Sequence, residues 1–282
     1  MSNLLEELTE ARPNPRQEAA VRGRGVSPKR GKAATLSRGV AGLVALASIW
    51  ELAPRLGLVD PYFIPPLHAV LDAWWGMVLD GELLRHVRAS LVRSAIGFGL
   101  AIAIAIPLGA VIAWYRPARE FLTPVLEIFR NTAALAILPV FMLLLGIGET
   151  SKIAIVLYAC FFPVLLSTIT GVATVDPQLL RSARVLGLAP VATFRKVVFP
   201  AAIPTIFTGI RISGAAAILV LIAAEMIGAN SGVGFQVMNA QYNFQIPLMF
   251  AAILLLALLG LTANFVLERL QSRLCRWSKI KD

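Results

Sequence analysis

Six long runs of apolar residues, separated by short polar breaks, constrain this sequence more than any other feature. The hydrocarbon core of a bilayer is about 30 Å thick, and a helix that crosses it needs roughly 20 apolar residues. The runs lie at residues 39–58, 92–114, 121–147, 152–174, 203–228 and 247–267. The chain is 57% hydrophobic and 15% charged, whereas soluble domains are about 25% charged. The sequence therefore predicts an all-α, polytopic membrane protein with about six transmembrane helices.

The runs divide the chain into a membrane domain, residues 39–268, and two polar tails. Residues 1–38 are basic and contain several prolines and glycines, and such a segment lacks the apolar residues that a folded core needs. We expect a disordered tail there and a second basic tail at 269–282. A cleaved signal peptide is the alternative for the N-terminus, but the first run continues into Glu51 and Pro54 without a small-residue cleavage site.

The distribution of basic residues predicts the orientation in the membrane. Lys and Arg outnumber Asp and Glu by 26 to 16, which gives a formal charge of +10. Nucleic-acid binding would need these charges on one folded face, but they lie in the tails and between the apolar runs. The first tail holds eight, residues 115–120 hold two, residues 175–202 hold four and the segment after 268 holds five. The positive-inside rule then places both termini in the cytoplasm.

The stretch 59–91 differs from the apolar runs. It contains prolines, several charges and the pair Trp74-Trp75, a composition typical of a helix that lies at the membrane surface. We expect this stretch on the periplasmic side. Arg85, Arg88 and Arg93 do not fit the positive-inside rule there, and we interpret them as reaching from an interfacial helix to the lipid headgroups.

The segment 175–202 carries the strongest local signals for helix ends. Asp176 can cap a helix whose first residue is Pro177. Gly187 can end that helix in the left-handed conformation, and Pro190 can begin a second helix. An apolar stripe and a basic pair share the second helix: Val191, Phe194, Val197 and Val198 beside Arg195 and Lys196. The pattern predicts two short helices joined by a glycine turn, although an amphipathic connector that rests on the headgroups would look the same.

The spacing within this segment is more specific than its helices. Arg181-Ser182-Ala183 is followed after three residues by Gly187 and thirteen positions later by Pro200. This arrangement resembles the cytoplasmic signature loop of bacterial ABC importer permeases, in which Glu-Ala-Ala precedes the Gly and the Pro. Arg181 and Ser182 depart from the Glu and the first Ala of the family, so a salt bridge from that Glu is in doubt. The resemblance extends over about residues 40–275.

Other motifs narrow the resemblance to the permease branch that serves aliphatic sulfonates, taurine and nitrate. They are Ile64-Pro65-Pro66, Leu138-Pro139, Gly146-Ile147-Gly148, Phe161-Phe162-Pro163 and Ala223-Ala224-Glu225-Met226-Ile227-Gly228. The resemblance implies a type I ABC importer permease fold in the bacterial inner membrane. It also implies a complex of two permease chains, the second expected to be another copy of this one, with two cytoplasmic ATPases and a periplasmic binding protein. The residues that would couple to the ATPase are Arg181, Ser182, Ala183, Gly187, Phe194, Arg195 and Pro200.

The sequence carries no phosphate-binding loop. The nearest approach, Gly25 followed by Gly31-Lys32-Ala33, has one residue too many and an Ala in place of the hydroxyl that holds magnesium. ATP and Mg²⁺ are therefore expected on a partner ATPase, and this chain is expected to have no catalytic residue. The two Cys and two His show no metal-ligand spacing either.

Polar residues within the runs are the candidates for the translocation path. An ionisable group at membrane depth costs roughly 2.5 to 3.5 kcal/mol on insertion scales, so it needs a structural or functional reason. The candidates are Arg130, Asn131, Thr132, Arg211 and Glu225. Either arginine could attract an anionic solute or could reach the headgroups instead. Glu225 could pair with such an arginine or serve as a periplasmic gate.

Three classes of function are compatible with a polytopic helical chain. The signature loop favours an importer permease that moves a small, anionic solute resembling a sulfonate, taurine or nitrate. A secondary transporter is the alternative, but the sequence has no convincing inverted repeat. A membrane enzyme would need convergent His, Asp, Ser or Cys residues, which are not found at any suitable spacing.

Overall fold

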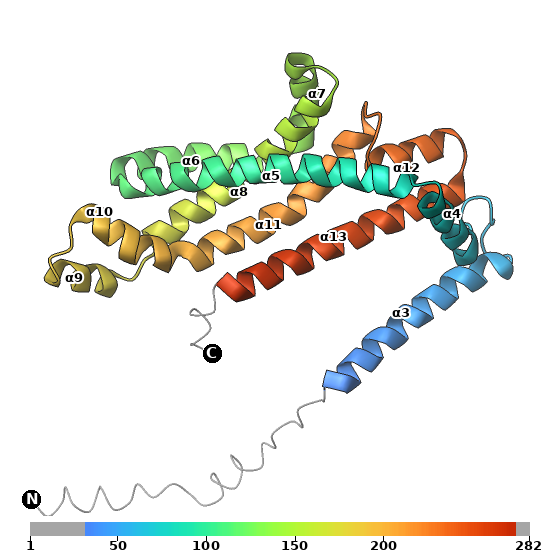
Figure 1. Cartoon of the computed structure of the whole chain (residues 1–282), viewed down its shortest axis with the longest axis horizontal. Coiled ribbons are helices and arrows are strands. Elements are labelled where there is room, and N and C mark those ends of the chain that lie inside the picture. Colours follow the sequence, from blue (N-terminus) through green and yellow to red (C-terminus); the bar gives the residue numbers. More distant parts are fainter. Residues whose placement is uncertain (1–31, 275–282) are drawn as a thin grey trace, which may run out of the picture. The chain divides into compact units, whose positions relative to one another are not determined.

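The computed structural model describes residues 32–274, with side chains from Arg38 onward. Of the predicted tails, 1–38 and 269–282, residues 1–31 and 275–282 lie outside the described residues, whereas residues 32–38 and 269–274 are helical. The chain divides into two units, residues 1–58 and residues 59–282, and each is described by itself. All regular elements of the described residues are helices, which confirms the all-α fold (Figure 1).

The first unit contains one described helix, α3, at Lys32–Arg55. It carries most of the first apolar run and ends where Pro54 and Arg55 precede Gly57, whose φ is +71°. Arg55 forms an ion pair with Glu51 one turn earlier. At 1.5 Å per residue, 24 residues extend for about 36 Å.

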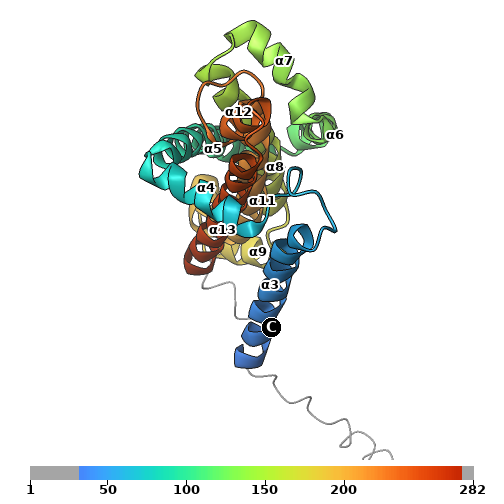
Figure 2. The same ribbon diagram turned by 90° about the vertical axis from the view of Figure 1, so that its right-hand side faces the viewer.

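The core of the second unit consists of three long helices that pack along most of their length. They are α5 (Glu82–Trp114), α8 (Glu149–Ala173) and α11 (Phe199–Met226). The end-on view shows α8 and α11 between α5 on one side and α6 on the other (Figure 2). A fourth long helix, α13 (Ile246–Leu274), packs against α11 and α12.

Small residues allow the core helices to approach closely. A side chain at Gly97 would collide with Val156 of α8, and one at Gly109 would collide with Thr168 on the same helix. Gly209 of α11 lies against Ser167 in the same way. Without water to drive association, membrane helices depend on such close packing. Gly99, by contrast, faces open space.

Four helices of the described chain are long and apolar enough to cross a membrane, or up to five if one bent pair counts as a span. The four are α5, α8, the continuous stretch Pro190–Met226 and α13. The bent pair consists of α6 (Arg116–Asn131) and α7 (Ala134–Leu145), with 88° between them. The expected number of about six is therefore approximate, because α3 is not among the helices that qualify.

The run at 121–147 does not form one continuous helix. Figure 1 shows α7 turned away from the line of α6. The break falls at Thr132 and Ala133, whose backbones are extended with ψ of 125° and 113°. The two helices together are long and apolar enough for one span, so hydropathy does not distinguish them. A run defined by composition alone cannot detect a bend between two extended residues.

The segment 59–91, for which an interfacial position is predicted, contributes to two helices. A short apolar helix, α4 (Leu67–Leu79), contains the two tryptophans. Residues from Glu82 onward, however, belong to α5, a single helix of 33 residues. A further short helix, α12 (Val233–Tyr242), packs near the same end and has no counterpart among the predicted runs.

Candidate functional site

The segment predicted to form two helices does so at one end of the second unit, here called the loop end. It contains α9 (Pro177–Val185) and α10 (Pro190–Thr193). Asp176 caps α9 by accepting a hydrogen bond of 2.8 Å from the amide of Gln178. Gly187 has a φ of +68°. The amide of Gly187 donates to Arg184 and that of Leu188 donates to Ala183, which is the Schellman arrangement that favours glycine.

The second loop helix, which begins at Pro190, does not end before the apolar run that starts at residue 203. A π-helical turn, η1 (Phe194–Val198), joins α10 to α11, and the backbone stays helical from Pro190 to Met226. Pro200 lies inside this continuous stretch, two residues after the π-helical turn. Movement of the loop can therefore pass directly into a core helix, because no flexible link separates them.

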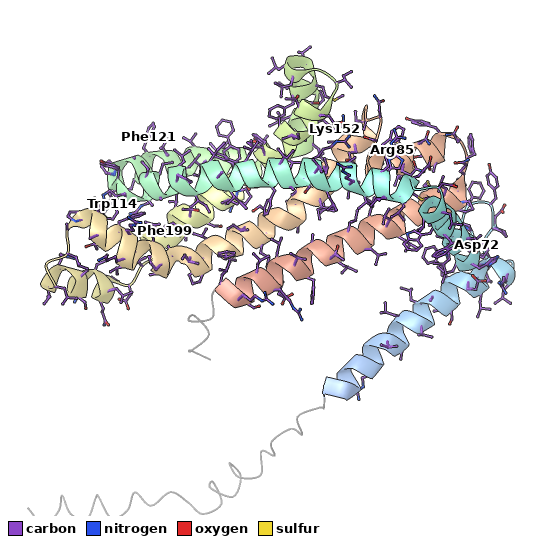
Figure 3. All side chains as sticks on the ribbon, in the orientation of Figure 1. Asp72, Arg85, Trp114, Phe121, Lys152 and Phe199 are labelled. Atoms are coloured by element: carbon purple, nitrogen blue, oxygen red, sulfur yellow. The ribbon has the colours of Figure 1, made fainter. Side chains whose placement is uncertain are left out.

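The loop turns one set of side chains inward and leaves another exposed. Phe194 contacts Trp114 at 5.2 Å between ring centroids, and Figure 3 shows Trp114 and Phe199 together at the loop end. Ala183 and Val198 are buried. The exposed set is mixed in chemistry: Arg181, Ser182, Val185, Leu186, Val191, Arg195 and Lys196. Exposed apolar side chains beside basic ones are typical of a protein–protein contact.

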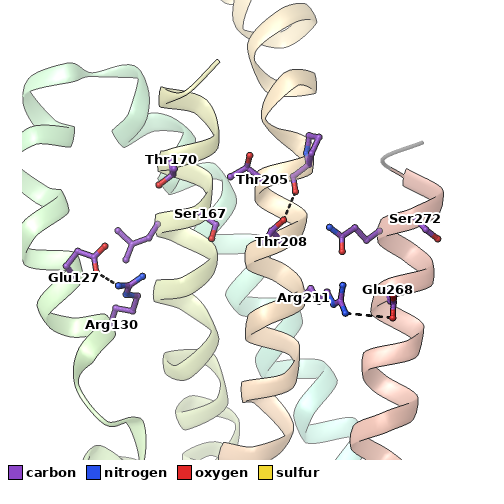
Figure 4. A pocket seen from close by; sticks show the side chains of 12 residues that line it. Glu127, Arg130, Ser167, Thr170, Thr205, Thr208, Arg211, Glu268 and Ser272 are labelled. Carbon is purple, nitrogen blue, oxygen red and sulfur yellow. Dashed lines mark hydrogen bonds and ion pairs between the residues drawn. The ribbon is translucent and has the colours of Figure 1, made fainter. Parts of the chain in front are cut away.

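A cavity of about 630 Å³ opens between α6, α8, α11 and α13 (Figure 4). Both arginines predicted for the path line it, Arg130 from α6 and Arg211 from α11. Hydroxyl groups cover much of the wall between them: Ser167, Thr170, Thr205, Thr208 and Ser272. The cavity therefore brings together groups that can bind an anion.

Each arginine of the cavity has a carboxylate neighbour. Arg130 lies 2.7 Å from Glu127 on its own helix, and Arg211 lies 3.8 Å from Glu268 of α13. The second pair is long for an ion pair, so Arg211 keeps hydrogen-bonding capacity for another acceptor. The other predicted path residues are elsewhere. Asn131 and Thr132 lie at the bend after α6 and do not line the cavity.

Glu225 is not paired with either cavity arginine. It lies fourteen positions from Arg211 on the same helix, about 21 Å away, and is completely buried. Its carboxylate accepts hydrogen bonds from Arg93 at 2.6 Å and from Ser90 at 2.8 Å, both on α5. The amide of Gly234 in α12 also donates to it, at 3.1 Å.

Arg93 is the centre of this buried network, and its interpretation as a headgroup-seeking residue is wrong. The side chain is 3% exposed and bridges Glu225 of α11 and Glu149 of α8. It also donates to the carbonyl of Ser231 at 2.6 Å. A guanidinium has five donors in a fixed fork, so one side chain can join three helices and the loop before α12. The two carboxylates offset the cost of burying the Arg93 guanidinium.

Neighbouring groups complete the network at the end of the unit opposite the loop, here called the far end. Ser90 accepts a hydrogen bond of 2.9 Å from the amide of Val233, and His86 accepts one of 3.1 Å from that of Gly232. The ammonium group of Lys152 donates to the carbonyls of Gly148 and Gly228 at 3.0 and 3.2 Å. Figure 3 shows Lys152 and Arg85 toward this end.

The sequence contains a signal for this network, although the apolar runs do not reveal it. His86, Ser90, Arg93 and Gly97 recur at three- and four-residue spacing. Together they form one helical face, which continues with the buried Ala101, Ala105 and Gly109. A polar residue on the small-residue face of a membrane helix points toward other helices. That criterion would have separated Arg93 from the exposed Arg85 and Arg88.

Comparison with known proteins places this geometry in a family. A family model described as the binding-protein-dependent transport system inner membrane component matches residues 105–276. The chain belongs to this family of importer permeases. The permease is the membrane subunit of an ATP-driven importer, and ATP is used by a separate ATPase subunit. The importer interpretation is thereby confirmed, and the secondary-transporter alternative is set aside.

Two relatives and one solved structure illustrate the similarity. The permease is 34% identical over 248 residues to the taurine transport system permease protein TauC of Escherichia coli, covering 86% of this chain and 90% of that one. It is 33% identical over 232 residues to the putative aliphatic sulfonates transport permease protein SsuC of Bacillus subtilis, covering 82% and 84%. A chain of the MetNI methionine ABC transporter, in an inward-facing conformation, aligns with a TM-score of 0.59 and 19% identity over 70% of this chain and 97% of that one. This last match supports the fold alone.

Within residues 32–274, no group of three or more His, Cys, Asp or Glu side chains could hold a metal ion. Cys160 is buried and free in α8. Cys275 lies outside the described residues.

Proposed function

We propose that the permease moves a small organic anion with a sulfonate-like headgroup, such as taurine or an alkanesulfonate, through the cavity lined by Arg130 and Arg211. The observation that supports this most directly is the pair of guanidinium groups across one hydroxyl-lined space. A sulfonate has three acceptor oxygens and one negative charge, which suits Arg and Ser or Thr donors. The relatives named for sulfonates and taurine support the same class of solute.

The carboxylates in the cavity suit a solute that must leave again. Glu127 and Glu268 hold the two arginines when no anion is present. An incoming sulfonate would replace a carboxylate as partner of Arg211, and the carboxylate would recover it on release. Binding at each step then stays weak, which transport requires because a solute held tightly would not be released. Nitrate also has three oxygen acceptors and one negative charge, so the same donors suit it, and it is the inorganic comparison for the proposed class.

Coupling is assigned to the loop between α8 and α11. We assign the contact with the ATPase to Arg181, Ser182, Arg195 and the exposed apolar side chains of the loop. Ala183, Gly187, Phe194 and Pro200 would hold the loop helices and join them to α11. The proposed complex contains two copies of this permease, two ATPases that bind ATP and Mg²⁺, and a periplasmic binding protein. The inner membrane is the proposed location, with both termini and the loop in the cytoplasm.

To test this proposal, the permease is reconstituted in lipid discs with its ATPase and binding protein. Taurine, alkanesulfonates, nitrate and uncharged analogues are then compared for stimulation of ATP hydrolysis and for uptake into vesicles. Stimulation by sulfonates and loss of uptake in Arg211→Gln, with normal assembly, are the expected results.

A matched control is Arg116→Gln, which removes an exposed arginine from α6 outside the cavity. It should transport normally. Unchanged sulfonate uptake in both Arg130→Gln and Arg211→Gln would overturn the assignment of the cavity, and stimulation by uncharged analogues alone would overturn the class of solute.

A further inference from the structure

A second groove, of about 680 Å³, lies on the outer side of α5 toward the far end and has no role in the function proposed above. Ten residues of α5, α8 and the turn before α5 line it, among them Arg85, Arg88 and Arg93. Glu149 is the one carboxylate in the lining. The groove differs from the cavity, where two arginines face two carboxylates.

The charges in this groove are unequally satisfied. Arg93 and Glu149 neutralise each other within the buried network. Arg85 and Arg88 lie on successive turns of α5 and are exposed, and no ion pair joins either one to a carboxylate in the described part of the chain. Two positive charges are therefore left for an external anion.

The length of α5 places these two charges in the headgroup layer. From Val92 to Trp114 there are 22 positions, or about 33 Å, which matches a hydrocarbon core of about 30 Å. Trp114 then marks one interface, as aromatic residues commonly do. Arg88 lies four positions before Val92, about 6 Å outside the core, within a headgroup layer of roughly 5 to 7 Å. Arg85 lies seven positions before Val92, about 10.5 Å outside the core, from where its long side chain can reach back into that layer.

The surface next to the arginines is apolar and exposed. Val92 and Ile96 form part of the groove, and the same face of α5 continues with Leu100 and Ile104, which are 43% and 48% exposed. A ligand in this position would contact two guanidinium groups at one end and apolar side chains of α5 along the rest of its length. That combination matches a phospholipid with its phosphate at Arg85 and Arg88 and its acyl chains along α5.

We infer that this groove is a binding site for an anionic phospholipid of the leaflet at the far end. The two guanidinium groups bind the phosphate and the net negative headgroup, and the apolar face of α5 holds the chains. The site also explains why arginines occur at this end against the positive-inside rule, since their partner is lipid rather than a protein carboxylate.

The test uses the complex of the permease with its ATPase in detergent. Binding of phosphatidylglycerol and of zwitterionic phosphatidylethanolamine is titrated by native mass spectrometry. A basic side chain near an anionic surface contributes about a fivefold change in affinity, so Arg85→Gln with Arg88→Gln should weaken phosphatidylglycerol binding by about 25-fold. The control is Arg116→Gln with Arg119→Gln, which removes two arginines from the loop end and should leave this site unchanged.

Each of the following results would overturn the inference. Equal binding of the two lipids, or equal binding by wild type and the Arg85/Arg88 variant, would mean that no anionic lipid site exists. If the Arg85/Arg88 variant bound lipid normally but its ATP hydrolysis were no longer stimulated by the binding protein, the two arginines would instead contact an acidic protein surface. If the Arg85/Arg88 variant formed a smaller assembly than the wild type on size-exclusion chromatography, a second copy of the chain would be the occupant of the groove.

Discussion

Glu225 illustrates how single residues hold the far end together. The carboxylate has three hydrogen-bonding partners from α5 and α12, and Arg93 links it to Glu149 of α8. The two carboxylates differ in environment, since Glu225 has no exposed surface and Glu149 is 63% exposed. Removal of one partner from a buried pair leaves an uncompensated charge, whereas an exposed partner can be replaced by water.

Glu225→Gln should therefore destabilise the protein much more than Glu120→Gln. Loss of one partner of a buried pair costs about 3 to 5 kcal/mol, whereas exposed pairs such as Arg116 with Glu120 contribute about 0 to 1 kcal/mol. Thermal unfolding of the detergent-solubilised complex measures the difference. Equal midpoints for the two variants would contradict the buried role of Glu225.

Gly232→Ala is expected to disrupt the same network from the backbone. Its φ is +118°, and an added Cβ would collide with the carboxylate of Glu225. Gly99→Ala is the matched control, because Gly99 lies in α5 with open space around its Cα and alanine favours helix by about 1 kcal/mol. We expect a lower unfolding temperature for the first variant and an equal or higher one for the second. A stable Gly232→Ala would mean that the loop before α12 can move away from Glu225.

At the scale of elements, the continuous helix from Pro190 to Met226 is the main connection between the loop and the core. The loop end has exposed apolar side chains, the middle of α11 carries Arg211, and its far end carries Glu225. A displacement of α10 would therefore reach the cavity and the buried network through one rigid element. The sharp bend between α6 and α7 provides no such connection.

Gly187→Pro should uncouple the loop without unfolding the membrane helices. Proline fixes φ near −65° and removes the amide that Gly187 donates to Arg184. Gly187→Asn is the control, because asparagine tolerates the left-handed conformation better than other residues. We expect loss of solute-stimulated ATP hydrolysis in the proline variant and its retention with asparagine, at similar yields of purified permease. Loss of activity in both variants would indicate that the contact needs the absence of a side chain rather than the turn.

At the scale of the whole molecule, the two ends of the second unit should face opposite sides of the membrane. Ser182 is exposed at the loop end, and Asp80 precedes α5 at the far end. Single cysteines at these positions, in a background with Cys160 and Cys275 replaced by serine, can be labelled with a membrane-impermeant maleimide. Ser182→Cys should react only in inside-out vesicles and Asp80→Cys only in right-side-out vesicles. Reaction of both from one side would refute the orientation.

The sequence by itself determined the class of fold, the helical loop and the family to which the chain belongs. These depend on local properties: apolar length, the capping by Asp176, the left-handed Gly187 and the spacing to Pro200. Periodicity and hydropathy report such features because each involves residues close together in the chain.

Only the tertiary structure decided which polar residues meet. It joined Arg130 and Arg211 in one cavity, separated Glu225 from both, and gave Glu225 a partner, Arg93, that lies 132 positions away in the chain. It also bent the run at 121–147 through 88° and merged the second loop helix with α11. Partners and bends of this kind depend on which helix faces come together, and that choice is made by packing across the whole unit rather than by neighbours in sequence.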